Sequence, residues 1–186
     1  QDGETLVEAC RRGASERTVR YMLREGGEGI AADHTDDRGR TALMWACHHG
    51  YPLGVVRALI TSRHAAPVDQ ADEDGWTPLF AACRNGHLEV VRYLVTEAHA
   101  AVNQATNSGA TPLHVACSKG HLEVVRCLVT EAHAAVNQAM NNGATPLYVA
   151  AALRYFVVVR YMASASARLT QLDSAVWQNE QVLRAL

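Results

Sequence analysis

The sequence predicts an all-α solenoid, in which stacked helix-turn-helix units are joined by short β-turn connections and closed by a C-terminal capping helix. The first observation behind this prediction is a Gly-x-Thr-Pro-Leu motif that begins at Gly75, Gly109 and Gly143, with 34 residues between successive glycines. The second is that residues 86–105 and 120–139 are identical except at one position. A period of this length is typical of a protein built from stacked supersecondary units.

The third observation is the spacing of the cysteines. Four of the five follow an alanine and recur at intervals of 34 to 37 residues: Cys10, Cys47, Cys83 and Cys117. Because stacked helices lie roughly 8–10 Å apart, and a disulfide spans at most roughly 7 Å between Cα atoms, we expect buried thiols rather than disulfides. The absence of a Cys-x-x-Cys pair also argues against a zinc site. Free buried thiols are typical of a reducing compartment.

The elements of one unit can be taken in order from the third repeat. The step Asp74-Gly75 supplies a turn with a positive φ angle. Thr77 is placed to cap a first helix over residues 79–84, with proline at the start, where a missing N–H is tolerated. After a turn at residues 85–87, the second helix carries its apolar residues on one stripe, namely Leu88, Val91, Leu94 and Val95.

These motifs resemble the ankyrin repeat, whose signature is Thr-Pro-Leu-His-x-Ala with a period near 33 residues. Residues 111–116 match that signature in full, and Gly-His-Leu-Glu-Val-Val at Gly86 and Gly120 is similar to the family pattern. The resemblance covers roughly residues 3–165 and implies a solenoid of stacked helix pairs. It places an ankyrin repeat domain at residues 1–171, with units at about 3–37, 38–72, 73–106, 107–140 and 141–170.

The units depart from the family pattern in informative ways. Histidine stands where ankyrin units usually end the second helix with glycine, and histidine is enriched in left-handed conformations among non-glycine residues. We therefore interpret His64, His99 and His133 as helix C-caps rather than as a row of metal ligands. The first unit lacks the proline and resembles a degenerate N-terminal cap. Pro52 and Pro67 are insertions that lengthen the second unit.

The fifth unit replaces the glycine of the helix-helix turn by Arg154 and continues with the apolar run 155–159. Val157 stands where earlier units place glutamate, so this face needs a cover. The tail offers an apolar helical stripe, and we expect a C-terminal capping helix over residues 172–186. The alternative is the start of a further domain or a partner-binding helix. The stripe consists of Leu172, Val176, Leu183 and Leu186.

Composition excludes several classes of function. The 186 residues include 17 Lys and Arg against 19 Asp and Glu, a net charge of −2, which is not that of a globally basic nucleic-acid or membrane binder. The longest apolar run is far shorter than the roughly 20 residues of a membrane span. The chain begins at Gln1 without features of a signal peptide. We expect a fragment of a longer intracellular protein, cytoplasmic or nuclear.

No constellation of residues predicts catalysis. The adjacent pair His48-His49 is expected to diverge on a helix, and His87 and His121 belong to the repeat pattern. Paired carboxylates such as Asp36-Asp37 are expected on exposed turns, without the burial that shifts a catalytic pKa. We therefore predict that the chain is not an enzyme and uses no cofactor or metal.

The resemblance implies binding of a protein through the turn tips and the concave face of the first helices. The third and fourth units differ mainly there, although drift at exposed positions would give the same pattern. The family's contact positions correspond to Arg38, Arg40, His48, His49, Glu73, Asp74, Trp76, Arg84, Asn85, Asn107, Ser118, Lys119, Asn141, Asn142 and Tyr148. We expect Trp76 to be exposed at a turn tip, where Trp is a frequent interface hot spot, and Trp45 to be core.

We therefore predict a monomeric protein-protein interaction module, a scaffold or adaptor that binds another protein. The alternative is an intramolecular regulatory or tethering domain of a larger multidomain protein, and a third possibility is a structural spacer. Nucleic acid is a poor fit as a partner, because Arg38, Arg40 and Arg84 are opposed by the acidic residues of the same turns.

Overall fold

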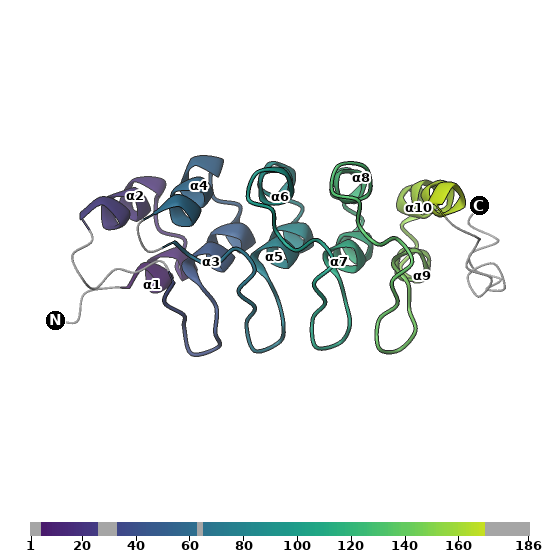
Figure 1. Ribbon diagram of the computed structural model, residues 1–186, viewed down its shortest axis with the longest axis horizontal. Helices are drawn as coiled ribbons and strands as arrows, with labels where there is room; N and C mark the ends of the chain where they lie inside the picture. Colours follow the sequence, from purple (N-terminus) through teal and green to yellow (C-terminus); the bar gives the residue numbers. More distant parts are fainter. Residues whose placement is uncertain (1–4, 26–32, 63–64, 170–186) are drawn as a thin grey trace.

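The computed structural model describes residues 5–25, 33–62 and 65–169, and it confirms the all-α solenoid. Over these residues the chain forms ten helices, and the only β-type pairing is an isolated bridge between Thr35 and Thr41. Figure 1 shows the helices in two layers, an inner layer of odd-numbered helices and an outer layer of even-numbered ones. The helices are α1 (Leu6–Arg11), α2 (Glu16–Glu25), α3 (Ala42–His49), α4 (Leu53–Thr61), α5 (Pro78–Asn85), α6 (Leu88–Thr96), α7 (Pro112–Lys119), α8 (Leu122–Thr130), α9 (Pro146–Ala152) and α10 (Phe156–Leu169).

Threonine begins every inner helix, as the repeat pattern predicts. In α5, the Thr77 side chain accepts a hydrogen bond from the backbone N–H of Phe80, and Pro78 occupies the first turn. The same threonine cap is present at α1, α3, α7 and α9. These caps satisfy N–H groups that a helix leaves unpaired at its start, so each inner helix begins at a fixed residue.

The turn between inner and outer helix also holds neighbouring units together. Gly86 ends α5 in the left-handed conformation, with φ of 76°. The imidazole Nε2–H of His121, in the next unit, donates to the Arg84 carbonyl at 3.2 Å. A Cβ on Gly86 would lie 2.8 Å from that imidazole ring, so glycine is required both for the φ angle and for the approach of the histidine. His87 donates to the His48 carbonyl in the same way, also at 3.2 Å.

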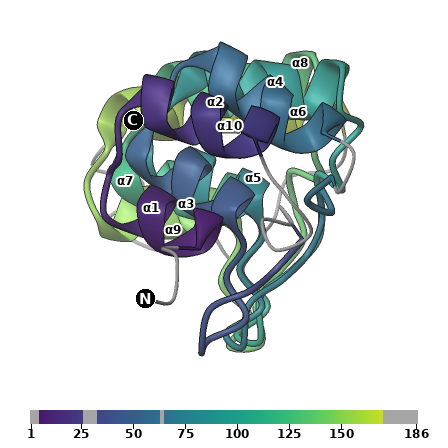
Figure 2. The same cartoon turned by 90° about the vertical axis from the view of Figure 1, so that its left-hand side faces the viewer.

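The loops between units form hairpin tips that stack on one another (Figure 2). In each tip the first residue donates to the fifth, as Asp72 N does to Trp76 O at 3.0 Å. The tips of the third, fourth and fifth units also bond to the tip before them, as Asn107 N does to Asp74 O at 3.1 Å. Backbone bonds of the same kind come from Glu73 and Asn141. The tips project at an angle from the helix layers and therefore border the inner helices along the length of the array.

The core lies between the two layers and repeats from unit to unit. Leu43, Leu79, Leu113 and Leu147 occupy one position of successive inner helices and are all buried. All five cysteines are buried and free, as expected. Burial raises the pKa of Cys10 and of Cys117 to about 12, so both groups are neutral thiols that pack as small apolar side chains.

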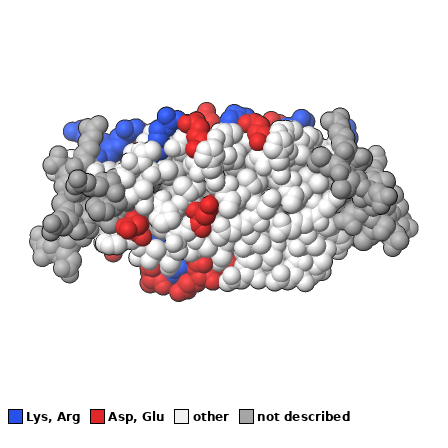
Figure 3. Space-filling model, in the orientation of Figure 1, with Lys and Arg blue, Asp and Glu red and all other residues white. Residues whose placement is uncertain are grey.

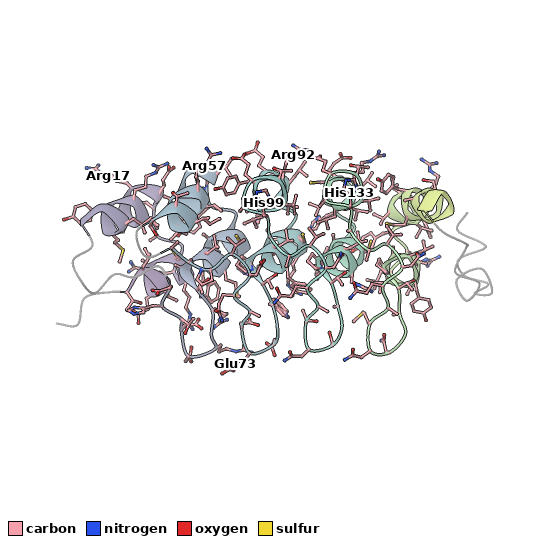
Figure 4. All side chains as sticks on the ribbon, in the orientation of Figure 1. Arg17, Arg57, Glu73, Arg92, His99 and His133 are labelled. Carbon is pink, nitrogen blue, oxygen red and sulfur yellow. The ribbon has the colours of Figure 1, made fainter. Side chains whose placement is uncertain are left out.

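The histidines after the outer helices adopt the predicted left-handed conformation. The φ angles of His99 and His133 are 53° and 52°, although the helices themselves end at Thr96 and Thr130. Figure 4 labels both histidines beside their outer helices. Both side chains are exposed, which fits a backbone role. His64 and the proposed capping helix at residues 172–186 lie outside the described residues.

Ion pairs join the outer helices across neighbouring units. Arg57 on α4 pairs with Glu97 at 3.1 Å, and Arg92 on α6 pairs with Glu131 at 3.0 Å. Figure 3 shows the resulting alternation of basic and acidic side chains along the upper edge, and Figure 4 labels Arg57 and Arg92 there. Exposed pairs of this kind contribute little to stability, typically about 0–1 kcal/mol.

Candidate binding groove

A pocket of about 220 Å³ opens between the second and third units, on the side of the inner helices that the hairpin tips border. Two hairpin tips and the inner helices α3 and α5 enclose it. Its walls combine two tryptophans with charged residues of both signs. The lining residues are Arg38, Arg40, Met44, Trp45, His48, Asp72, Asp74, Trp76 and Ala81.

The expectation that Trp76 stands exposed at a turn tip is wrong. Trp76 is half-buried and packs against the hydrophobic core. Its ring lies 5.1 Å from the ring of Phe80, and the guanidinium of Arg84 sits over it at 4.8 Å. A Trp that packs against the core and lies under a guanidinium is held in place, which lowers the entropy it would lose on binding a partner.

The expectation that Trp45 belongs to the core is also wrong, because Trp45 is half-buried and lines the same pocket. Its indole N–H donates to the Asp36 carboxylate at 3.2 Å, and the guanidinium of Arg40 lies 4.5 Å above its ring. Trp45 occupies the helix position that Ala81 fills in the next unit. The side chain packs against the edge of the core and also lines the pocket.

The Asp36 carboxylate, which contacts Arg40 and Trp45 of the pocket, is largely shielded from water, with 7% of its side chain accessible. Burial by itself would raise its pKa. Hydrogen bonds from the backbone N–H groups of Arg40 and Arg38, the Trp45 indole and the charge of Arg40 outweigh burial, so that the pKa lies below its ordinary value. This carboxylate is thus a fixed anion that orients Arg40 and Trp45, and the expectation of a wholly exposed pair at Asp36-Asp37 is wrong for Asp36.

The two adjacent histidines do not diverge as the sequence suggested. The rings of His48 and His49 lie 5.1 Å apart, and both contact the ring of Trp45. Asn85 Nδ2 donates to His48 Nδ1 at 3.2 Å, so that ring nitrogen accepts a hydrogen bond and carries no proton. Burial, followed by the neighbouring cationic groups, lowers the pKa of His48, and the side chain is therefore neutral at pH 7.

The structure thus brings half of the predicted contact residues together. Arg38, Arg40, His48, Asp74 and Trp76 line the pocket, and Arg84, Asn85 and His49 contact its walls. Arg38 closes one side through an ion pair with Asp74 at 2.8 Å. Sequence reasoning did not select four of the lining residues, which are Met44, Trp45, Asp72 and Ala81.

Of the remaining predicted residues, Glu73 lies on the hairpin tip between the lining residues Asp72 and Asp74. The others belong to the fourth and fifth units, and two of them support the fold. The side-chain amide of Asn107 donates to Glu73 O at 2.7 Å, and that of Asn141 donates to Asn107 O at 2.9 Å. These bonds tie one hairpin tip to the next. Ser118 and Lys119 end α7, Asn142 lies on the tip of the fifth unit, and Tyr148, with 41% of its surface exposed, lies in the first turn of α9.

Charge is distributed unevenly along the tips. The tips of the second and third units carry Asp36, Asp37, Asp72, Glu73 and Asp74, and Figure 3 shows this acidic patch at the lower left edge. Glu73 is labelled at the tip in Figure 4. Among residues 5–25, 33–62 and 65–169 no group of three or more possible metal ligands occurs. In the same ranges no helix is long and apolar enough to cross a membrane.

Stacked helix pairs, capped by threonine and linked through hairpin tips, define a repeat solenoid. The chain belongs to the ankyrin repeat family, because the family model described as ankyrin repeats (3 copies) matches residues 6–106 and 96–173. Ankyrin repeats are protein-interaction modules whose stacked units create an extended binding surface.

Several known proteins are similar to part of this chain. The chain is 43% identical over 68 residues to Palmitoyltransferase AKR1 of Candida glabrata, which is 37% of this chain and 8% of that protein. It is 35% identical over 98 residues to the ankyrin repeat and KH domain-containing protein mask-1 of Caenorhabditis elegans, covering 53% of this chain and 4% of that protein. Protein phosphatase 1 regulatory subunit 27 of Mus musculus is 36% identical over 91 residues, 49% of this chain and 55% of that protein. The chain therefore spans less than two thirds of each of these relatives.

Proposed function

We propose that this chain is a scaffold or adaptor module that binds a partner protein through the pocket between its second and third units. The observation that carries the proposal is the convergence of two tryptophans, each under an arginine guanidinium, on one pocket. Trp and Arg are the residues most enriched in interface hot spots, and such hot spots lie in packed, preformed pockets. The five free buried thiols are in keeping with an intracellular module.

Each wall of the pocket is fixed before any partner arrives. Trp45 is held by Asp36 and Arg40, and Trp76 by Phe80 and Arg84. Because the side chains are already ordered, a partner would lose little of its binding energy to ordering them. The remaining surface of the array contributes complementary contacts rather than most of the energy.

Comparative capture from a cell lysate tests this proposal. The bait is the whole chain, alongside a Trp76→Ala, Arg84→Ala variant and a matched control, Arg92→Ala, which removes an exposed arginine on α6. We expect at least one protein whose capture falls about tenfold or more with Trp76→Ala, Arg84→Ala, since hot-spot truncations cost about 2 kcal/mol. Capture of the same protein by Arg92→Ala should be unchanged. Circular dichroism confirms that each variant is folded. Equal capture of every protein by all three baits would contradict the assignment.

A second candidate function is intramolecular: the array docks on, or tethers, another domain of a longer chain. The observation that favours it is that this chain matches only 8% and 4% of two relatives. The two functions differ in one measurement. In the intramolecular case, a crosslink from the pocket in the longer protein joins it to the same polypeptide, whereas an adaptor crosslinks to another.

A further inference from the structure

The hairpin tips of the second and third units carry an aspartate at the same position, Asp36 in one and Asp72 in the other. In both aspartates Oδ1 accepts hydrogen bonds from the backbone N–H groups two and four residues further along the tip. The distances are 3.0 Å and 3.0 Å at Asp36, and 3.0 Å and 2.8 Å at Asp72. The same backbone bonds therefore hold the two carboxylates in the same way within their tips.

The two carboxylates differ at their second oxygen. Oδ2 of Asp36 accepts from the guanidinium of Arg40 at 2.9 Å and from the indole of Trp45 at 3.2 Å. The third unit has Trp76 in place of that arginine and Ala81 in place of that tryptophan. Among the described residues both hydrogen bonds of Asp72 end on Oδ1. Its Oδ2 therefore has no donor from this part of the chain, whereas the equivalent oxygen of Asp36 has two.

The pocket lies where the third unit lacks these donors. Asp72 and Ala81 both line it, and the helix position of Ala81 is the one that Trp45 fills in the second unit. Asp72 is half-buried, so its carboxylate has lost part of its hydration. A half-buried carboxylate gains most from a charged donor, because charge-assisted hydrogen bonds are about twice as strong as neutral ones. The free volume and the free oxygen thus call for the same ligand, a cation with N–H groups.

We propose that the pocket binds an arginine side chain of the partner protein, whose guanidinium donates to Oδ2 of Asp72 and stacks on a tryptophan ring. This inference rests on the proposed function, because it names the chemistry of the partner at that same pocket. The second unit provides the pattern within the chain itself, since Arg40 bonds to Asp36 and lies 4.5 Å above the ring of Trp45. Arginine suits both contacts, because its planar guanidinium pairs with carboxylates and stacks on aromatic rings.

The charge around the pocket favours a basic ligand over an acidic one. Of the three arginines at the pocket, two already pair with aspartates, at 2.8 Å and 2.9 Å, and Arg84 is the third. Three carboxylates of the same two tips have no ion pair within the described residues, namely Asp37, Asp72 and Glu73. These tips form the acidic patch of Figure 3. A basic segment of a partner would therefore meet a complementary surface around the pocket.

Titration of the whole ¹⁵N-labelled chain with short blocked peptides tests the proposal. The probe is acetyl-glycyl-arginyl-glycinamide. One matched peptide carries citrulline, which keeps the planar shape and loses the charge, and another carries glutamate. We expect the arginyl peptide to shift the indole N–H signals of Trp45 and Trp76 at roughly millimolar concentrations. The citrullyl peptide should bind about tenfold more weakly, because it forms only neutral hydrogen bonds.

The variant Asp72→Asn isolates the proposed contact. Its amide oxygen keeps the two backbone bonds of Oδ1, so the tip should fold as before, and an N–H₂ group replaces Oδ2. We expect about tenfold weaker binding of the arginyl peptide, with no preference left over the citrullyl peptide. Glu89→Gln, at an exposed position on α6, removes the same charge far from the pocket and should leave both affinities unchanged. Circular dichroism checks the fold of each variant.

Three outcomes would overturn the proposal. The first is that neither indole signal shifts with the arginyl peptide up to about 10 mM, and the second is equal binding by Asp72→Asn and the unchanged chain. The third is tighter binding of the glutamyl peptide, which would indicate an acidic partner held by Arg84. Capture from a lysate tests the proposed function separately. A protein that Trp76→Ala, Arg84→Ala fails to capture, together with no response to the arginyl peptide, would leave the pocket as the binding site and refute only its preference for arginine.

Discussion

At the scale of single residues, the carboxylate of Asp36 does most to position the pocket. Its Oδ1 accepts hydrogen bonds from the backbone N–H groups of Arg38 and Arg40, each at 3.0 Å. Its Oδ2 accepts from Arg40 Nε at 2.9 Å and from Trp45 Nε1 at 3.2 Å. One anion thus fixes the hairpin tip, an arginine and a tryptophan together.

Replacing Asp36 by asparagine should disrupt this arrangement. An amide N–H₂ in place of Oδ2 would face two N–H donors, those of Arg40 and Trp45, so a buried donor loses its acceptor. We expect a loss of about 2 kcal/mol in the free energy of unfolding and a change in Trp45 emission. Urea denaturation measures the first and fluorescence the second. Asp72→Asn is the matched control, because the two backbone bonds that Asp72 accepts both go to one oxygen, which an amide keeps.

The effect of Asp36→Asn should depend on pH. The pKa of Asp36 is lower in the folded chain than its ordinary value of 3.8. The ionised Asp36 carboxylate therefore makes its full contribution to the free energy of unfolding above about pH 4. This contribution is lost as the pH falls through the folded-state pKa. The difference in the free energy of unfolding between the wild-type chain and Asp36→Asn should shrink below that pH. A difference that stays constant down to pH 2 would show that the charge of Asp36 does not contribute to stability.

Residue-level predictions from the sequence failed where two units meet. Trp76 was expected at an exposed tip and Trp45 in the core, because each was interpreted within its own repeat. In the structure both line one pocket, since a tip of the third unit lies beside an inner helix of the second. The repeat period predicts which positions are equivalent. It does not predict which side chains at non-equivalent positions of neighbouring units come into contact. By contrast, His114 followed the family signature and is buried, with Nε2 donating to Ala144 O at 3.1 Å.

At the scale of elements, the hairpin tips owe their stacking to glycine. Gly109 has a φ of 82°, and a Cβ there would lie 2.7 Å from Asn141 N in the next tip. Gly143 has the same φ angle, and a Cβ there would have nothing within 4 Å. The two glycines share a backbone conformation and differ in whether another tip packs against them.

Alanine at these two glycines should separate the backbone cost from the packing cost. Gly143→Ala should lose about 1 kcal/mol, the cost of a left-handed alanine. Gly109→Ala should lose about 1–3 kcal/mol more, because the Cβ overlaps backbone that cannot yield freely. Urea denaturation of both variants measures the difference. Equal losses would mean that the tips move apart at little cost.

The elements themselves were largely predictable. Three features depend only on residues that are close together in the sequence, and a sequence pattern therefore predicts them. They are the threonine caps, the prolines in the first turn and the left-handed glycines. The first helix expected over residues 79–84 is found at Pro78–Asn85. The tip-to-tip bonds of Asn107 were not foreseen, because Asn107 was considered as a contact for a partner. The donor and its acceptor lie in different units, so no local pattern reveals the bond.

At the scale of the whole molecule, stability should vary along the array. Each unit packs only against its neighbours, so a central unit is buried on two sides and a terminal unit on one. The inner helices α5 and α7 each bury six residues, whereas α1 buries four. The third and fourth units also carry the full Thr-Pro-Leu motif and the histidine link between units.

Native-state hydrogen exchange should therefore be slowest in the backbone amides of α5 to α8 and fastest in α1 and α2, with opening free energies that differ by on the order of 2 kcal/mol. The histidine links allow a direct check. His121→Ala removes the bond to Arg84 O and weakens the contact between the third and fourth units. Amides of the first two units should then exchange as before, while those of α7 to α10 exchange faster. A uniform increase across all helices would instead show that the array unfolds as one cooperative body, since a change at one interface would then be felt equally at every unit.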